Sequence, residues 1–339
     1  MSAKYSRIIS TGSALPAARI TNEDLARRLA ADGIETSDEW IRTRTGIEAR
    51  RFVNGTTETT TTLAAAAAQK ALEGGGVDPK TIDLIIVATT TPDQVFPSTA
   101  AAVQRLIGAA GCAAGCAAGC AAFDVQAVCA GFIYALNAAD AMLRAGPYQR
   151  ALVIGAETMS RVIDMKDRAT CVLFGDGAGA VVLEASAKPG ILAARMYADG
   201  SYDENVLGLT ARIDHGELCG RPYINMDGRQ VFKLAVDGLT SSAQEVAVLA
   251  GVDPQDVDVY IPHQANLRIM TMVAKKLGIP DERMIKTVSE QGNTSAASVP
   301  LALDEAVRSG KISDGSLVLL QAVGAGMAWG SAIVRWRSE

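Results

Sequence analysis

Histidine and aromatic residues are scarce in this sequence, and neither sign of charge dominates it. The 339 residues include two histidines and 5% aromatics, and 32 Lys and Arg stand against 37 Asp and Glu, which gives a net charge of −5. Proteins that bind nucleic acid normally carry a basic surplus, so nucleic acid is not an expected partner. An acidic protein partner would have to dock on a local basic patch.

Long apolar runs are also missing. The first residues, MSAKYSRIISTGSALP, lack the apolar core of a signal peptide, so a cytoplasmic protein is expected. Residues 106–123 carry no charge, but they are mostly Ala, Gly and Cys and are too weakly apolar to enter a bilayer. No membrane partner is therefore expected.

The six cysteines are too few for a disulfide scaffold in a chain of this length. Three of them, Cys112, Cys116 and Cys120, belong to a GCAA unit that occurs three times in succession over residues 111–122. We expect these three to be small-residue filler from a tandem duplication, with no metal and no other cofactor. The alternative is a metal-binding or redox protein in which the spaced cysteines hold a metal, although no histidine lies nearby.

The two halves of the chain resemble each other. Residues 76–88, GVDPKTIDLIIVA, match residues 251–263, GVDPQDVDVYIPH. Each copy begins with a turn that ends a helical pattern, near 62–73 and 233–250, and continues into a β-branched run typical of a buried parallel strand. Two further pairs follow in the same order: RALVIGAET (150–158) with GSLVLLQAVGAG (315–326), and FGDGAGAVVLEA (174–185) with MAWGSAIVRW (327–336).

These ordered pairs predict an α/β protein made of two similar halves packed about a pseudo-twofold axis, each built from parallel β/α units. The pattern breaks at ASAKPG, near Lys188 to Gly190. We therefore predict that one half spans residues 1–188 and the other spans residues 189–339.

Cys129 lies where a strand pattern, AFDVQAV, meets a helical one. The helical spacing appears in the apolar residues Phe132, Leu136, Ala139 and Leu143. At the mouth of a helix, amide donors and the positive end of the helix dipole would lower the pKa of a thiol and favour the thiolate. Cys129 is therefore the candidate nucleophile, and the alternative is a small buried thiol.

His263 and Asn293 occupy similar positions. His263 ends the repeated strand before an amphipathic helix, where sites in α/β proteins form. Asn293 follows a strand-like run and precedes a helix, although asparagine is also a routine capping residue. We predict that Cys129, His263 and Asn293 converge at one end of the sheets, whereas His215, in a polar loop, faces solvent.

The motifs around these residues resemble the β-ketoacyl-acyl carrier protein synthase III family of the thiolase superfamily. The resemblance covers nearly the whole chain, in the segments TSDEWIRTRTGI, VFPSTA, FDVQAVCAGFIYAL, FGDGAGA, PHQANLRI, GNTSAASVPLALDEAV and WGSAIVRW. It implies a thiolase-like five-layered αβαβα fold, a homodimer, and a Cys-His-Asn triad at Cys129, His263 and Asn293.

The implied reaction is a decarboxylating Claisen condensation that initiates fatty acid synthesis. Cys129 takes an acyl group from acyl-CoA, a substrate rather than a cofactor, and malonyl-acyl carrier protein then supplies an enolate. His263 and Asn293 stabilise that enolate by hydrogen bonds. The backbone amides of Cys129 and Ala325 form a second oxyanion hole, although the family commonly has Gly where this chain has Ala325.

The resemblance also implies three groups of binding residues. Trp40, Arg44 and Arg168 bind CoA. The acyl pocket is formed by Met159, Phe174 and, from the partner subunit of the dimer, Phe96, and a bulky Phe96 favours short primers such as acetyl. Carrier protein, which is acidic, docks on Lys233, Arg268, Lys275 and Lys276.

Other condensing enzymes remain alternatives. A relative with the same triad could make a specialised product, such as a polyketide starter or a quinolone-type heterocycle, and only its pocket would differ. A Cys-His-His elongating enzyme would need a second histidine in a matching motif. A thiolase would need a second catalytic cysteine late in the chain, and none follows Cys219.

Overall fold

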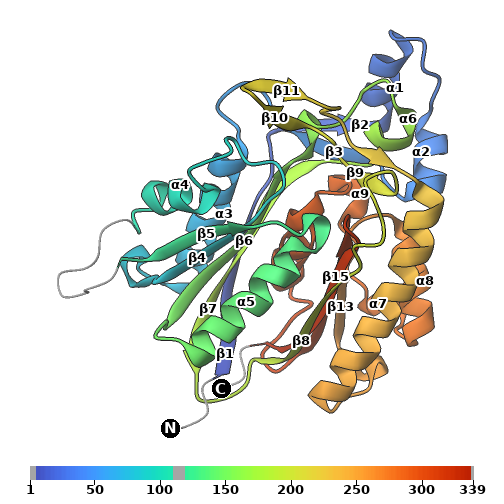
Figure 1. Ribbon diagram of the computed structural model, residues 1–339. Helices are drawn as coiled ribbons and strands as arrows, with labels where there is room; N and C mark the ends of the chain where they lie inside the picture. The colour runs from blue at the N-terminus through green and yellow to red at the C-terminus, as the bar shows by residue number, and fades with distance from the viewer. Residues whose placement is uncertain (1–4, 110–118, 337–339) are drawn as a thin grey trace.

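The chain builds two mixed β-sheets, of five and four strands, and sandwiches them between helices (Figure 1). The computed structural model describes residues 5–109 and 119–336. Cys112 and Cys116 of the GCAA repeat lie outside the described residues. The first sheet has the order β1 (Tyr5–Ala14), β7 (Asp176–Ser186), β6 (Arg150–Thr158), β4 (Leu84–Ala88) and β5 (Ala121–Val125).

The second sheet repeats the core of the first. Its order is β13 (Val259–Pro262), β14 (Leu317–Gly324), β15 (Ala328–Arg335) and β8 (Ile191–Ala198). β4 pairs with β6 in parallel and β6 with β7 antiparallel, and β13, β14 and β15 pair in the same way. The pseudo-repeat is thus confirmed, but the expectation of parallel units throughout is wrong, because β7 and β15 run antiparallel to β6 and β14. β15 follows β14 in a short hairpin, whereas residues 159–175 connect β6 to β7.

The same turn begins both repeats. Gly76 and Gly251 take left-handed φ values of 61° and 69° at the C-terminal ends of α3 (Thr60–Gly75) and α7 (Gly228–Ala250). Asp78 and Asp253 then cap the short 3-10 turns that lead into β4 and β13. Glycine is favoured where φ is positive, which explains why both copies keep the Gly-Val-Asp-Pro sequence.

The helices form three layers around the two sheets, which confirms the five-layered αβαβα fold (Figure 1). α3 and α4 (Thr99–Leu106) cover the outer face of the first sheet, and α7 and α8 (Leu267–Leu277) cover that of the second. α5 (Gly131–Ala145) and α10 (Ser298–Arg308) fill the space between the sheets.

Alternation along the strands separates these layers. In β4, Ile85 and Val87 pack against α3, whereas Leu84 and Ile86 pack against α5. Successive side chains of a strand point to opposite faces, so a strand covered on both sides is apolar throughout. The apolar residues expected to face the core from α5, namely Phe132, Leu136, Ala139 and Leu143, are all fully buried.

Smaller elements surround this framework. The remaining helices are α1 (Asn22–Ala30), α2 (Asp38–Thr45), α6 (Arg168–Cys171) and α9 (Val288–Gln291). The short strands are β2 (Ala18–Thr21), β3 (Ala49–Phe52), β9 (Leu207–Gly208), β10 (Arg212–Asp214), β11 (Glu217–Cys219) and β12 (Asn225–Met226). Within residues 5–109 and 119–336, no helix is both long and apolar enough to cross a membrane.

The chain leaves the first sheet at Ser186, the end of β7, and enters the second at Ile191, the start of β8. This crossing contains the ASAKPG segment at which the sequence pattern breaks. However, α10 from the second half packs in the middle layer beside α5 from the first. The division into 1–188 and 189–339 therefore remains an interpretation of the repeat.

Candidate active site

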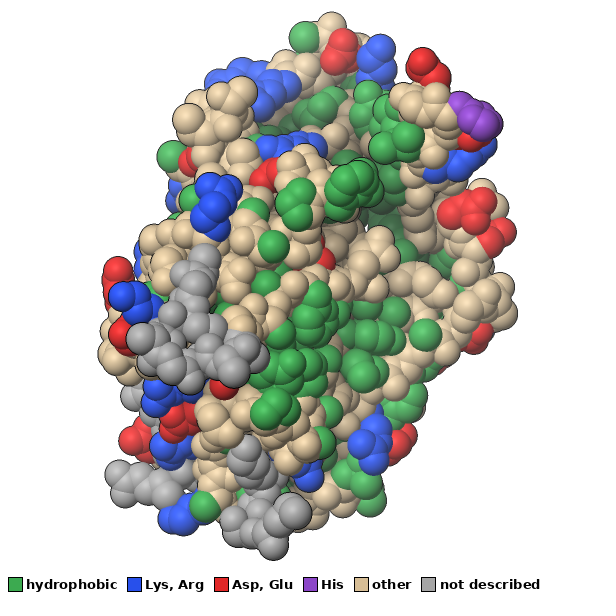
Figure 2. All heavy atoms as spheres, turned by 60° about the vertical axis from the view of Figure 1, so that its left-hand side comes forward, with side chains coloured by type: hydrophobic (Ala, Val, Ile, Leu, Met, Phe, Trp, Pro, Cys, Tyr) green, Lys and Arg blue, Asp and Glu red, His purple; other side chains and the backbone are tan. Residues whose placement is uncertain are grey.

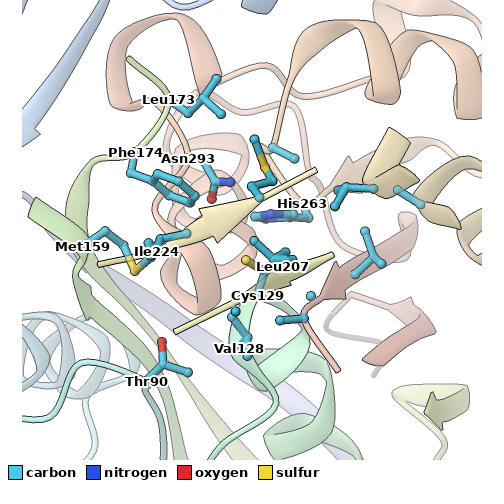
Figure 3. Close-up of a pocket in the computed structure, with 18 of the residues that line it drawn as sticks. Thr90, Val128, Cys129, Met159, Leu173, Phe174, Leu207, Ile224, His263 and Asn293 are labelled. Carbon is cyan, nitrogen blue, oxygen red and sulfur yellow. The ribbon is translucent and has the colours of Figure 1, made fainter. Parts of the chain in front are cut away.

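Cys129, His263 and Asn293 line one cavity with a volume of about 500 Å³ (Figure 3). All three side chains are buried from bulk solvent, with exposed fractions of 4%, 3% and 7%. Most other lining residues are apolar, including Met159 and Phe174. A largely apolar cavity with a few convergent polar groups is typical of a site for a small organic ligand.

Cys129 lies on η2 (Val128–Ala130), a single 3-10 turn that leads directly into α5. The residue before it, Val128, has φ of 48°, which is rare for a β-branched residue and costs about 1–3 kcal/mol. The predicted position of Cys129 at the mouth of a helix is therefore confirmed, and the entry turn is strained.

The end of β14 passes directly over the backbone of Cys129. A Cβ added to Gly324 would lie 2.7 Å from the Cys129 amide nitrogen and 3.0 Å from the Ala127 carbonyl oxygen. The next residue, Ala325, lines the same cavity and is not among the described residues with positive φ. The alanine that departs from the family pattern is thus accommodated without backbone strain.

Replacing Gly324 with alanine is expected to slow acyl transfer to Cys129. The added methyl group meets backbone atoms, which cannot move aside as a flexible side chain would, so η2 must shift. We expect a loss of about 100-fold in the acylation rate, because small misplacements of reacting groups have effects of this size. Stopped-flow measurement of CoA release would test it. A Gly200→Ala variant, at a glycine where a Cβ meets nothing within 4 Å, is the matched control.

Burial dominates the chemistry of the Cys129 thiol. It raises the pKa to about 12, the neighbouring Ser295 hydroxyl lowers it, and the charge of Glu157 raises it. The sequence-based expectation of a lowered thiol pKa is therefore wrong, because the thiol is buried away from water beside a carboxylate. A raised pKa favours the protonated thiol, so a nearby group that accepts its proton would help to form the nucleophile.

His263 is buried and its ring is held by Ser298. Its Nδ1 lies 2.6 Å from Oγ of Ser298, and this oxygen also accepts the Gln264 amide hydrogen at 3.4 Å. A Ser298 hydroxyl that donates to Nδ1 leaves the hydrogen of the imidazole on Nε2. Burial lowers the pKa of His263 to about 3, so the ring is a neutral hydrogen-bond donor.

Asn293 is fixed by backbone and side-chain contacts. Its amide donates to the Leu173 carbonyl at 2.8 Å, and its own carbonyl accepts from Gly175 at 2.9 Å. Its Oδ1 accepts the Ser295 amide hydrogen at 2.9 Å, which leaves the Nδ2 hydrogens for the cavity. The expectation of a strand-like run before Asn293 is wrong, because this segment forms the short helix α9. Asn293 itself pairs with Phe174 only as an isolated β-bridge.

Glu157, at the end of β6, lies fully buried near Cys129 and was not singled out in the sequence. Its carboxylate accepts hydrogen bonds from Thr89, Thr90, Thr91 and Ser295. Burial raises the pKa of Glu157, whereas the hydrogen bonds from Thr91, Thr90 and Ser295 lower it. One sequence signal marks it, namely a lone carboxylate in the apolar strand RALVIGAET.

The predicted CoA residues cluster beside the cavity. The guanidinium carbons of Arg44 and Arg168 lie 4.6 Å and 4.4 Å from the ring centroid of Trp40. Arg168 also donates to the Glu35 carbonyl at 2.6 Å, and the Arg44 carbonyl accepts from Asn266, which lines the cavity. The structure thus brings the three residues together in a cation–π cluster, adjacent to the cavity rather than within its lining.

The predicted acyl-pocket residues separate into two groups. Met159 and Phe174 line the cavity and are each 3% exposed. Phe96 is 83% exposed and lies outside the cavity of its own chain. Its expected contribution from a partner subunit stays a prediction.

The predicted docking residues lie on two neighbouring helices. Lys233 is on α7, and Arg268, Lys275 and Lys276 are exposed on α8, where Arg268 also lines the cavity. Lys276 forms an ion pair with Asp237 of α7 at 3.3 Å, which neutralises part of the positive charge. Arg268 is the docking residue that also lines the cavity, so a positive charge lies beside the active site at this point.

Two other sequence-based expectations concern histidine and metal. His215 has a side-chain exposure of 97%, as predicted for a loop residue. Among residues 5–109 and 119–336, no group of three or more His, Cys, Asp or Glu side chains could hold a metal ion. Cys120, the described cysteine of the GCAA repeat, is half-buried next to β5.

Family models and solved structures of known proteins match this chain. Residues 123–200 match the family described as 3-Oxoacyl-[acyl-carrier-protein (ACP)] synthase III, and residues 248–336 match its C-terminal domain. The 3-oxoacyl-[acyl-carrier-protein] synthase III of Aquifex aeolicus is 46% identical over 98% of this chain and 100% of its own, with a TM-score of 0.88.

Two further solved structures are similar over almost their full lengths. The β-ketoacyl-[acyl carrier protein] synthase III of Thermus thermophilus is 40% identical over 97% of this chain and 99% of its own, with a TM-score of 0.87. A priming β-ketosynthase of a polyketide biosynthetic pathway is 36% identical over 98% of this chain and 97% of its own, with a TM-score of 0.89.

Proposed function

Because this chain belongs to the 3-oxoacyl-[acyl-carrier-protein] synthase III family of condensing enzymes, we propose that it joins a short acyl-CoA to malonyl-acyl carrier protein and thereby initiates fatty acid synthesis. The observation that carries this proposal is the convergence of Cys129, His263 and Asn293 in one buried cavity. A thiol opposite two neutral N–H donors is suited to acyl transfer followed by enolate formation.

In the first step, the Cys129 sulfur attacks the thioester carbon of acyl-CoA and CoA leaves. The oxyanion that forms accepts hydrogen bonds from the backbone amides of Cys129 and Ala325. Gly324 supports this arrangement, because the absence of a side chain lets β14 approach the Cys129 amide closely.

In the second step, the malonyl thioester loses carbon dioxide. The thioester oxygen gains negative charge and accepts hydrogen bonds from Nε2 of His263 and Nδ2 of Asn293. Both donors are held from behind, by Ser298 and by the Ser295 amide, so they need no reorganisation during the reaction. The enolate then attacks the acyl group on Cys129.

Trp40, Arg44 and Arg168 are proposed to bind the nucleotide end of CoA. An indole stacks on adenine, and guanidinium groups bind phosphates. Both arginines lie over the indole ring of Trp40, so adenine that stacks on this ring would take the place of at least one guanidinium.

A Trp40→Ala variant is therefore expected to raise the KM for acyl-CoA about 10-fold, the effect of losing one stacking contact, with kcat little changed. Steady-state kinetics with varied acyl-CoA would test this prediction. A Trp329→Phe variant is the control, because Trp329 stacks on Tyr197 in the second sheet instead. A fall in kcat at unchanged KM would contradict the assignment.

A homodimer is proposed to complete the acyl pocket. β5 is an edge strand of the first sheet, and the nearby Val95 and Phe96 are 76% and 83% exposed. Figure 2, which turns this side of the molecule forward, shows hydrophobic side chains gathered over the middle of the face. An exposed edge strand beside large apolar side chains favours pairing with a second copy of the chain.

The primer is proposed to be acetyl, because a bulky Phe96 from the partner subunit would shorten the pocket. The carrier protein, which is acidic, is proposed to dock at Lys233, Arg268, Lys275 and Lys276, beside the cavity. The alternative is a priming enzyme of specialised metabolism, which the similarity to the polyketide priming β-ketosynthase supports. That enzyme class would use the same triad with a different primer.

One experiment tests nucleophile, reaction and primer. The protein is incubated with acetyl-CoA, the acylated cysteine is mapped by peptide mass spectrometry, and malonyl-acyl carrier protein is then added. Acetyl on Cys129 followed by acetoacetyl-carrier protein supports the proposal. Acylation only by longer or branched acyl-CoAs, in a parallel series, would favour the specialised-metabolism alternative, and acylation by none would overturn both.

A further inference from the structure

Glu157 is a buried carboxylate that the two-step mechanism above does not use. It is fully buried, and its oxygens receive donors of two kinds. The backbone amides of Thr90 and Thr91 reach Oε2 at 3.1 Å each, and the Thr90 hydroxyl and the Ser295 hydroxyl reach Oε1 at 2.8 Å and 2.9 Å. Oε1 also accepts the Thr90 amide at 3.2 Å, and Oε2 also accepts the Thr91 and Thr89 hydroxyls, so both oxygens meet backbone amides and hydroxyls. Backbone N–H groups can only donate, whereas a hydroxyl such as that of Ser295 can both donate and accept.

The Ser295 hydroxyl connects Glu157 to the nucleophile. It donates to Oε1 of Glu157 at 2.9 Å and lies near enough to Cys129 to lower the pKa of the thiol. Ser295 lies on η6 (Ser295–Ala297), which packs against η2, the turn that carries Cys129. Its φ of 51° is unusual for a residue other than glycine, which indicates that the surrounding structure forces this hydroxyl into place.

We propose that Glu157 takes the Cys129 proton through the Ser295 hydroxyl when the acyl-enzyme forms, and returns it when the product leaves. This inference rests on the proposed function and adds the proton acceptor that a buried, protonated thiol requires. Cys129 is the catalytic nucleophile, and Glu157 and Ser295 act through it.

The protons and charges balance. In acylation, the sulfur–hydrogen bond of Cys129 breaks, and Ser295 accepts that proton while it passes its own proton to Oε1 of Glu157. The sulfur bonds to the acyl carbon of acyl-CoA. CoA leaves as a thiolate and takes a proton from water. In condensation, the enolate expels the Cys129 thiolate, which regains its proton from Glu157 through Ser295. One proton is consumed per turnover, and no oxidant or reductant is needed.

Few other titratable groups face this relay. His263 lies in the same cavity but is neutral down to a pKa of about 3. On the neighbouring β7, Asp176 is opposite Thr158 in the strand register and is bound by Ser160 and the Val53 amide. Asp93, after β4, is paired with Arg161. A pH dependence of Cys129 reactivity near neutrality is therefore assigned to the pair of Cys129 and Glu157.

The test measures the rate at which iodoacetamide alkylates Cys129, as a function of pH, in the full-length protein. In the wild type, the rate should fall as acid protonates Glu157, whose pKa is raised by burial, and should be flat above that pH. In E157Q no acceptor is left, so the rate at pH 7 should be about 100-fold lower, the size of a general-base effect, and should rise about 10-fold per pH unit.

In S295A, the alkylation rate should rise with pH as steeply as in E157Q, although Glu157 is still present. This variant also tests the proposal if circular dichroism shows that E157Q is not folded. T89V is the matched control, because it removes a hydroxyl 3.4 Å from Oε2 of Glu157, on the side away from Ser295. Wild-type rates and pH profiles in both E157Q and S295A would overturn the proposal. So would a slow E157Q beside a wild-type S295A, since Glu157 would then act only on the structure.

Iodoacetamide needs no acyl-CoA, so the relay and the proposed function can fail separately. If E157Q slows alkylation but no acyl-CoA acylates wild-type Cys129, the relay stands and the proposed function fails. If acetyl-CoA acylates wild type, E157Q and S295A at equal rates, the proposed function stands and the relay fails.

Discussion

A Cys129→Ala variant is expected to take up no acyl group from acyl-CoA and to lose condensation by at least about 10³-fold. The side chain that would carry the acyl group is absent, and removing the nucleophile of a covalent mechanism has effects of this size or larger. The methyl group of alanine fits the buried site, so the fold should persist. Intact-mass spectrometry after incubation with acetyl-CoA, together with carrier-protein product formation, measures both losses.

Cys120→Ala provides the matched control, because Cys120 is half-buried beside β5 and outside the cavity. It should be acylated like the wild type. Retention of an acyl group by Cys129→Ala would mean that another cysteine or a serine is the acceptor, and the site assignment would be wrong.

His263→Ala and Asn293→Ala are expected to retain acylation of Cys129 but to lose condensation by about 10²- to 10³-fold each. Each variant removes one donor to the thioester oxygen, and the loss of one preorganised donor to a developing oxyanion has this magnitude. The test is carbon dioxide release from malonyl-acyl carrier protein, measured with enzyme that has first been acetylated. His215→Ala, in the exposed loop, is the control.

The pH dependence sharpens this second prediction. Burial lowers the pKa of His263 to about 3, so it is neutral and able to donate from Nε2 at all pH values above that. Decarboxylation by pre-acetylated enzyme should thus be nearly flat between pH 5 and 8, about two units or more above this pKa. A steep rise or fall with a midpoint near the ordinary histidine pKa of about 6.5 would contradict a neutral His263.

The fold was predictable because each sequence repeat contains a helix-ending turn followed by an apolar strand that is covered on both faces. Gly76 and Gly251 end helices with positive φ in both halves, and such positions can be inferred from local sequence alone. The antiparallel directions of β7 and β15 could not be inferred from local sequence, because they depend on which strands become neighbours in the folded chain.

The identity of the site residues was predictable from the sequence, whereas their protonation was not. Cys129, His263 and Asn293 follow recognisable local patterns, and the structure brings them together. The protonated state of the thiol was not predictable, since it depends on burial and on Glu157, which is 28 positions away in the sequence. Local sequence also could not identify α9, because its register is set by hydrogen bonds from residues 287 and 288 to the Gln264 side chain.

The pseudo-repeat has a consequence for stoichiometry. By the offset that relates residues 76–88 to residues 251–263, the position equivalent to His263 in the first half is Ala88. Ala88 is fully buried, and its Cβ lies 3.1 Å from a Cβ placed on Gly131, so this position of β4 packs against α5 and brings no hydrogen-bond donor to the cavity. In the part of the chain that the structure describes, Cys129, His263 and Asn293 thus have no second counterpart set at β4, and each polypeptide should carry one acyl group at saturation.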